Sequence, residues 1–178
     1  MIPDWLNEKM ARIKILLLDV DGVLTNGKLH FGNSGEVILP FDVKDGSGIT
    51  YLRRAGLLTG IITGKNNNAV SHRARDLQLT IVHRNVKNKV AVLDDILRTN
   101  NLLPEEALYI GDDLLDLSIM ERVGVSVAVA DAVAEVKEAA DYVTSKCGGD
   151  GAVREVCEMI LKAQNKWEAV VERYRSIQ

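Results

Sequence analysis

Five short apolar runs alternate with helix-like stretches, and this alternation constrains the fold more than any other feature of the sequence. The runs occupy residues 13–20, 58–63, 79–83, 107–111 and 125–130. The helix-like stretches lie at about 45–55, 66–77, 88–100, 113–122 and 150–174. Continuous apolar strands that alternate with helices are typical of a parallel sheet covered on both faces. The sequence therefore predicts an α/β protein with a central parallel sheet between two helical layers.

One segment breaks this alternation. Residues 27–46 contain two β-like stretches around the sequence GNSG, whose Asn and Gly tolerate the positive φ of a tight hairpin turn. We expect a β-hairpin flap at about 27–44, directly after the first strand. Because a two-stranded ribbon cannot bury this many apolar side chains alone, the hairpin should pack on something, and a neighbouring subunit is one candidate.

Length and composition limit the classes of function. The 178 residues fit a single domain over 1–178, with a helical tail at about 150–178. The net charge of −3 and an aromatic content of 4% argue against a nucleic-acid partner. No apolar run approaches the roughly 18 residues of a membrane span, and the charged N-terminus is unlike a signal peptide. Two cysteines are too few for a disulfide framework, so we expect reduced thiols in a cytoplasmic protein.

The first apolar run ends in two acids, Asp19 and Asp21. In a strand that continues to position 21, both carboxylates face the same side, and Gly22 then permits a turn. Such a pair can share a divalent cation, or one acid can act as nucleophile while the other handles protons. A purely structural pair that orders the loop after the strand is the alternative reading.

A second apolar run, 107–111, also ends in acids, Asp112 and Asp113, with Asp116 one turn further on. Asp116 is equally consistent with a structural role at the start of a helix. Parallel strands place their carboxyl ends at one edge of the sheet, where ligands bind in such folds. Because acids gathered there repel one another, a hard oxygen-ligated cation is expected, most plausibly Mg²⁺.

Two further segments add groups suited to an anion. In IITGK (61–65), Thr63 and the backbone N–H of Gly64 can donate to a phosphate, and Lys65 adds a positive charge; a plain helix cap is the alternative. Lys89 begins the stretch 88–100 and can offset charge on a phosphorylated intermediate, although most lysines are only solvated.

The ordered set DxDGV, a strand ending in Thr-Gly, a helix-opening Lys and GDDxxD resembles the haloacid dehalogenase superfamily of phosphotransferases, over residues 13–130. The resemblance implies a Rossmann-like fold and Mg²⁺. It implies that Asp19 attacks phosphorus to form an aspartyl phosphate. Asp21 would protonate the leaving alkoxide and then activate water, while Thr63 and Lys89 would hold the phosphoryl group.

The same resemblance implies the metal ligands. Asp112 would bind Mg²⁺ together with Asp19 and the backbone carbonyl of Asp21, and Asp113 would support the metal site directly or through water. The 44 positions between Asp19 and Thr63 leave no room for the cap domain of many superfamily members, so this is expected to be a capless member.

Longer strings, such as DVDGVLTNGKLHFGNSGEVILPFDVKDGSGI and YIGDDLLDLSIMERVGVSVAVADA, closely resemble 3-deoxy-D-manno-octulosonate (KDO) 8-phosphate phosphatases. That family implies a homotetramer whose hairpins form a central barrel, with each pocket completed by a neighbouring subunit, and a product used for lipopolysaccharide. Arg73 matches a family arginine and could bind substrate or simply occupy a helix surface. Lys44 lies at the hairpin base, near the expected mouth of the pocket.

Three positions depart from the family pattern: Ser47 replaces an aromatic residue, Lys65 an arginine and Asn85 a glycine. Asn tolerates a left-handed φ, so the backbone at 85 can be kept. Lys65 keeps its charge but loses bidentate recognition of a carboxylate. A phosphatase for a nine-carbon sugar acid, such as 2-keto-3-deoxynononic acid 9-phosphate, is therefore an alternative. A non-catalytic scaffold is a further one, which the intact acidic motifs disfavour.

Overall fold

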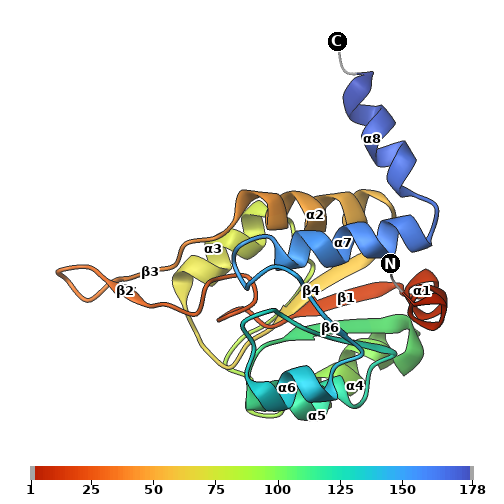
Figure 1. Ribbon diagram of the computed structural model, residues 1–178. Coiled ribbons are helices and arrows are strands. Elements are labelled where there is room, and N and C mark those ends of the chain that lie inside the picture. The colour runs from red at the N-terminus through yellow and green to blue at the C-terminus, as the bar shows by residue number, and fades with distance from the viewer. Residues whose placement is uncertain (1–2, 177–178) are drawn as a thin grey trace.

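The computed structural model describes residues 3–176, and its core is a six-stranded parallel sheet (Figure 1). The strand order is β5-β4-β1-β6-β7-β8, with every pair parallel. This confirms the predicted central sheet, to which β8 adds an edge strand that the sequence did not indicate. The strands are β1 (Ile15–Leu18), β4 (Leu58–Ile62), β5 (Ile81–His83), β6 (Ala107–Gly111), β7 (Val125–Ala128) and β8 (Tyr142–Val143).

Helices cover both faces of this sheet and complete the three layers (Figure 1). One face carries α2 (Val43–Arg54), α3 (Asn68–Asp76) and α7 (Ala152–Ala163). The other carries α4 (Lys89–Thr99), α5 (Leu117–Met120) and α6 (Ala134–Ala139). Two short 3₁₀ turns, η1 (Pro104–Glu106) and η2 (Leu114–Asp116), flank β6.

Polar caps fix where three of the helices begin. The side chain of Asp42 accepts a hydrogen bond from the backbone N–H of Asp45 at the start of α2, at 2.9 Å. Asn67 and Asn88 cap α3 and α4 in the same way. Each cap satisfies an N–H that the helix itself leaves without a partner. The Asn88 cap matters for function because Lys89 is the first residue of α4.

Burial in the interior of the sheet explains why the apolar runs contain so few polar residues. All four residues of β1 are fully buried, as are the side chains of Leu108, Tyr109 and Ile110 in β6. A strand with helices on both faces has no solvent-facing side, so apolar and polar residues do not alternate along it. The polar residues that follow these strands therefore mark the place where the core ends.

The predicted hairpin forms from β2 (His30–Phe31) and β3 (Val37–Ile38), paired antiparallel, and it projects away from the sheet (Figure 1). Gly35 supplies a φ of +84° in the turn. Val37 and Phe41 pack against the core, whereas Phe31 is 68% and Ile38 58% exposed. The expectation that the hairpin packs on something is thus met only at its base.

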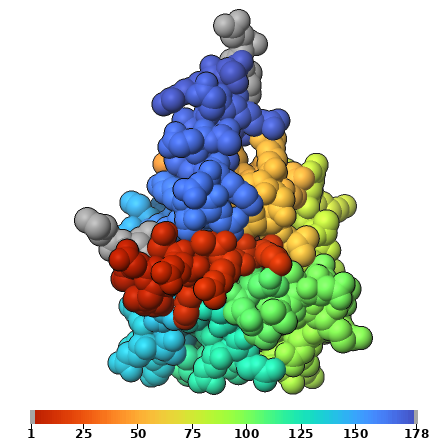
Figure 2. Space-filling view, turned by 90° about the vertical axis from the view of Figure 1, so that its right-hand side faces the viewer, coloured from red at the N-terminus to blue at the C-terminus, as the bar shows by residue number. Residues whose placement is uncertain are grey.

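The helix expected over 150–174 is wrong as one element. It consists of α7 and a separate α8 (Trp167–Arg175), because Asn165 adopts a left-handed φ of +55° between them. The stretch 113–122 likewise holds only η2 and the four-residue α5. Helix α1 (Asp4–Ala11), which was not predicted, lies across one end of the molecule below α8 (Figure 2).

Within residues 3–176, no helix is both long enough and apolar enough to cross a membrane.

Candidate active site

A hollow of about 180 Å³ lies at the carboxyl ends of β1, β4 and β6, where the sequence places its polar residues. Every predicted site residue except Lys44 and Arg73 lines it. The lining residues are Asp19, Asp21, Thr63, Gly64, Lys65, Val86, Lys87, Lys89, Asp112, Asp113, Leu115 and Asp116.

The chain turns sharply after β1, and this turn sets where the first two acids lie. The backbone N–H of Asp19 still bonds to the carbonyl of Ile110, at 3.0 Å, as if the strand continued. Gly22 then adopts a φ of +95°, and a Cβ at this position would lie 2.0 Å from a carboxylate oxygen of Asp112. Only glycine fits here, because the two acidic loops approach so closely.

Asp19 is almost completely buried, with 8% of its surface exposed. Its Oδ1 accepts a hydrogen bond from Lys89 Nζ at 2.7 Å. Burial raises the pKa of Asp19 to about 6; Lys89 opposes this shift and the nearby Asp116 adds to it. A buried carboxylate held beside a fixed cation is suited to act as a nucleophile.

Lys89 is the only cation among the buried residues of this group. Burial acts to lower the pKa of Lys89, but attraction to Asp19 and Asp116 outweighs it, so the net pKa is raised. Its ammonium donates to Asp19 Oδ1, Asp116 Oδ1 and the Tyr109 hydroxyl, at 2.7, 2.7 and 2.9 Å. All three of its N–H donors are therefore engaged by the protein.

Asp116 is buried and takes the structural alternative that its sequence position left open. Its Oδ1 accepts from Lys89 and from the hydroxyl of Tyr109, and its Oδ2 accepts from the backbone N–H groups of Asp112 and Asp113. These four donors use the acceptor capacity of a carboxylate. Asp116 thus holds Lys89 on one side and the acidic loop on the other.

The acids can hold a divalent cation. Asp19, Asp112 and Asp116 each offer a carboxylate oxygen, and these oxygens lie within 4.8 Å of one another. Burial, with repulsion from Asp19, Asp116 and Asp113, raises the pKa of Asp112 to about 7. A hard cation with oxygen ligands would relieve this repulsion, and since Asp116 is already saturated by four donors, Asp19 and Asp112 are the available side-chain ligands.

The loop after β4 offers the groups expected to bind an anion. Thr63 is buried, and its hydroxyl accepts a hydrogen bond from the backbone N–H of Lys65 at 3.2 Å. The Lys65 ammonium lies 3.6 Å from the Asp21 carboxylate, and its side chain is 57% exposed. Asn85 adopts a φ of +56°, as its tolerance of the left-handed region predicts, so the loop opposite keeps its shape without a glycine.

Two predicted residues lie outside this hollow, and a third, Asp113, lines it with its carboxylate engaged elsewhere. Asp113 lines the hollow, but it is exposed and its carboxylate caps η2 by accepting from Leu114 N at 2.8 Å. Arg73 pairs with Asp76 at 2.7 Å and donates to the carbonyl of Asp42 at 3.0 Å, which ties α3 to the start of α2. Lys44 borders a separate hollow beside α7.

Comparisons with known proteins agree with this geometry. The family model described as haloacid dehalogenase-like hydrolase matches residues 58–156. The 3-deoxy-D-manno-octulosonate 8-phosphate phosphatase of Escherichia coli strain K12 is 44% identical over 158 residues, which are 89% of this chain and 84% of that protein. The chain belongs to this phosphatase family, within the haloacid dehalogenase-like hydrolases.

Solved structures of the family superimpose closely. The phosphatase from Yersinia pestis is 42% identical with a TM-score of 0.91, and the match covers 93% of this chain and 89% of that one. The phosphatase from Moraxella catarrhalis, solved in complex with magnesium ion, phosphate ion and KDO, is 34% identical with a TM-score of 0.94, covering 96% and 98%.

Sequence reasoning missed one residue of this phosphatase-family site, Tyr109. It lies in β6 with no exposed surface, and its hydroxyl bonds to both Lys89 and Asp116. Burial, followed by the charges of Asp116 and Asp19, raises the pKa of the Tyr109 phenol well above its usual value, so it stays protonated. The signal in the sequence was a polar atom inside an otherwise apolar strand, ALYIG.

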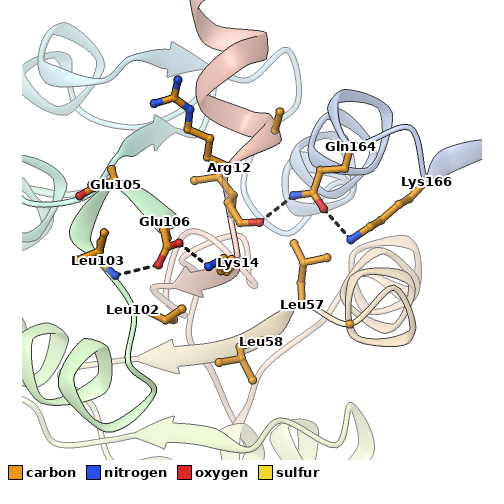
Figure 3. A pocket seen from close by; sticks show the side chains of 13 residues that line it. Arg12, Lys14, Leu57, Leu58, Leu102, Leu103, Glu105, Glu106, Gln164 and Lys166 are labelled. Carbon is orange, nitrogen blue, oxygen red and sulfur yellow. Dashed lines mark hydrogen bonds and ion pairs between the residues drawn. The ribbon is translucent and has the colours of Figure 1, made fainter.

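A larger hollow, of about 660 Å³, lies at the opposite end of the sheet from the family's acidic motifs (Figure 3). Several of its polar groups bond to one another or to the backbone: Lys14 pairs with Glu106, and Gln164 bridges the carbonyl of Ile13 and the ammonium of Lys166. Size therefore does not identify the reactive site here; the concentration of buried charge does.

Proposed function

We propose that this protein is a Mg²⁺-dependent phosphatase that hydrolyses KDO 8-phosphate to KDO and inorganic phosphate. The observation that carries the proposal is the buried Asp19, bound by Lys89 at 2.7 Å and grouped with Asp112 at the carboxyl edge of the sheet. Family membership at 44% identity, and a relative that was solved with magnesium, phosphate and KDO, support the substrate.

In the first half of the reaction, a carboxylate oxygen of Asp19 attacks phosphorus in line with the ester oxygen. The bond between phosphorus and that oxygen breaks, and Asp21 gives the leaving alkoxide its proton. Thr63 and the Gly64 N–H hold the transferred phosphoryl group, and the positive charge of Lys89, whose three N–H groups stay bonded to the protein, stabilises it. A bound Mg²⁺ supplies the positive charge that lets the anionic nucleophile and the anionic ester approach each other.

In the second half, the now ionised Asp21 takes a proton from water, and the hydroxide attacks phosphorus of the aspartyl phosphate. The bond from phosphorus to the Asp19 oxygen breaks, which restores the carboxylate and releases phosphate. Lys65, 3.6 Å from Asp21, supplies a positive charge beside this acid and at the mouth of the hollow.

A second substrate class is supported by one observation. Lys65 stands where the family has arginine, and it reaches Asp21 rather than projecting freely. Because an ammonium cannot grip a carboxylate through two parallel hydrogen bonds, recognition of the sugar-acid end differs from the family pattern. A nine-carbon acid such as 2-keto-3-deoxynononic acid 9-phosphate is therefore the alternative substrate.

The deciding experiment measures phosphate release with Mg²⁺ from a panel of phosphorylated sugar acids, comparing kcat/KM for the eight- and nine-carbon acids. A higher value for KDO 8-phosphate is expected, and a higher value for the nine-carbon acid would select the alternative. Asp19→Asn should abolish release from both. Equal release by that variant would overturn the nucleophile, and no turnover of any ester by the unaltered protein would favour a scaffold.

We further propose that the enzyme is a cytoplasmic homotetramer that serves lipopolysaccharide synthesis. Family membership and the exposed apolar hairpin side chains Leu29, Phe31 and Ile38 support assembly through the hairpin. On this proposal, Lys44 and Arg73, which lie outside the hollow of Asp19 in their own chain, approach the substrate only across a contact with a neighbouring subunit.

A further inference from the structure

Tyr109 is a buried phenol in the middle layer of the molecule, three residues before Asp112. Its side chain has no exposed surface, and β6 lies between β1 and β7 in the sheet. Its hydroxyl donates to Asp116 Oδ1 at 2.7 Å and accepts from Lys89 Nζ at 2.9 Å. A polar atom at this depth is costly unless it is paired, and here it is paired in both directions.

Every donor of this cluster has an acceptor. Lys89 has three N–H groups, and Asp19, Asp116 and Tyr109 accept one each. Asp116 Oδ1 takes two donors, Lys89 and Tyr109. If the hydroxyl were absent, Lys89 would have one buried N–H with no acceptor and Asp116 would lose one donor. The ammonium would then be free to rotate or to move towards Asp116.

The position of Lys89 matters because Lys89, Tyr109 and Asp116 together connect the nucleophile Asp19 to the acidic loop. Lys89 holds Asp19 Oδ1, while the other oxygen of Asp116 holds the backbone N–H groups of Asp112 and Asp113 at 3.0 and 3.4 Å. A shift of the ammonium away from Asp19 would move the nucleophile relative to Asp112. In-line attack is sensitive to displacements of this order.

We propose that Tyr109 is a positioning residue for phosphoryl transfer, whose hydroxyl fixes the Lys89 ammonium between Asp19 and Asp116. The inference rests on the proposed phosphatase activity and adds a residue that touches neither the substrate nor the metal ligands' side chains. Tyr109 acts through Lys89 and Asp116 alone.

The test is Tyr109→Phe, which keeps the ring and the packing and removes only the hydroxyl. The matched control is Tyr142→Phe on β8, which removes a hydroxyl that donates to Glu155 at 2.8 Å, away from the site. We expect Tyr109→Phe to lower kcat by about 10- to 100-fold, the consequence of leaving a buried charged donor without its acceptor. KM should stay within about threefold, because the hydroxyl does not contact substrate, and Tyr142→Phe should keep kcat within about twofold.

A double-mutant cycle distinguishes positioning from a general loss of stability. In an Asp116→Asn background, Tyr109→Phe should cost less than about threefold further in kcat, because the two residues act as one unit. A full additive loss in that background would overturn the proposal. So would a Tyr109→Phe enzyme that loses thermal stability but keeps the kcat of the unaltered protein at 25 °C.

A binding measurement keeps the inference separate from the proposed substrate. Beryllium fluoride with Mg²⁺ mimics a phosphoryl group on an aspartate, and ¹⁹F NMR reports its affinity without any turnover. Tyr109→Phe should weaken this binding by about tenfold relative to the unaltered protein and to Tyr142→Phe. Equal affinities in all three would overturn the role of Tyr109, whereas failure of every phosphorylated sugar acid to react would overturn only the proposed function.

Discussion

The charges of the site do not cancel within the protein. Lys89 offsets part of the charge on Asp19 and Asp116, yet burial still raises the pKa of Asp19 to about 6 and that of Asp112 to about 7. Each shift reflects the cost of keeping a buried carboxylate ionised, to which repulsion from neighbouring acids adds. The protein alone is therefore strained at neutral pH in the region where a divalent cation would stabilise it.

This strain predicts opposite effects for Asp112→Asn with and without metal. In EDTA, the free energy of unfolding of the variant should be higher than that of the unaltered protein by on the order of 1 kcal/mol, because a buried carboxylate that also repels its neighbours is removed. With Mg²⁺ at 100 times its dissociation constant, the unaltered protein should gain about 2.7 kcal/mol and the variant far less. Thermal unfolding across a Mg²⁺ titration measures both.

The control for that experiment is Asp95→Asn, which removes an exposed carboxylate on α4. It should leave the response to Mg²⁺ unchanged. An Asp112→Asn protein that responds to Mg²⁺ like the unaltered one would show that the cation is held elsewhere.

A second buried acid lies outside the site and predicts a pH effect on stability. Asp45 in α2 has no exposed surface and accepts from the backbone N–H groups of Arg154 and Gly151 at the start of α7, at 2.7 and 3.4 Å. Burial raises the pKa of Asp45 from 3.8 to about 6; those hydrogen bonds oppose the shift, and Asp42 and Asp150 add to it.

Because the folded pKa lies above the unfolded one, the stabilising contribution of Asp45 is complete below pH 4 and is lost as the pH rises through 6. The free energy of unfolding of the unaltered protein, relative to Asp45→Asn, should thus fall by up to about 3 kcal/mol between pH 4 and 7. Urea unfolding of both proteins at several pH values measures the difference. A constant difference over that range would contradict the assignment.

Single residues also show what the sequence could predict. Asp19, Thr63 and Asp112 follow apolar runs, so their meeting at one sheet edge follows from parallel topology alone. Tyr109 carries a polar atom within an apolar run, but its bonds to Lys89 and Asp116, and the four donors that Asp116 accepts, could not be predicted, because no local pattern reports which buried polar atoms will meet. Whether Lys44 and Arg73 reach substrate depends on surfaces that a single chain does not define.

At the scale of elements, α2 and α7 lie side by side on one face of the sheet (Figure 1). The two helices pack closely, and a Cβ on Gly48 would lie 3.1 Å from the Cβ of Cys157 and 3.2 Å from the Cα of Arg154. Such a distance is below ordinary van der Waals contact, so glycine allows the helices to approach.

Gly48→Val should therefore separate α2 from α7 and lower the free energy of unfolding by about 1–3 kcal/mol. Ser47→Val, at a half-buried position of the same helix, introduces the same side chain without that clash and should cost less than Gly48→Val. Chemical denaturation compares the two. Equal losses would mean that the close approach of the two helices at Gly48 does not set the cost.

Elements also mark a limit of prediction from the sequence. The apolar pattern of 150–174 continues through residue 165, so it indicated one helix. The break arises because Asn165 takes a left-handed φ, while Gln164 and Lys166 on either side bond to the carbonyls of Ile13 and Ala55. These partners are more than a hundred residues away in the chain, and no local pattern reports them.

At the scale of the whole molecule, the sheet and its helices bury their apolar side chains within one chain, whereas the hairpin leaves several of its own exposed. Phe31 and Ile38 expose 68% and 58% of their surfaces on a two-stranded ribbon that projects from the sheet (Figure 1). An isolated ribbon of this length gains little stability by itself, so its apolar side chains are best explained by burial against other copies of the chain. The proposed tetramer supplies that burial.

Phe31→Glu tests this directly, because a charge placed in an apolar interface would remain unpaired there and oppose assembly. Light scattering should give a tetramer for the unaltered protein and a smaller species for the variant, with a lower kcat/KM if the neighbouring subunit completes the pocket. Leu103→Glu is the matched control: it charges another exposed side chain, 56% exposed, near the opposite end of the sheet, and should leave the mass unchanged. A monomeric unaltered protein at micromolar concentration would contradict hairpin assembly. A tetrameric Phe31→Glu protein would instead move the interface to another face, since the ribbon could not then hold the subunits together.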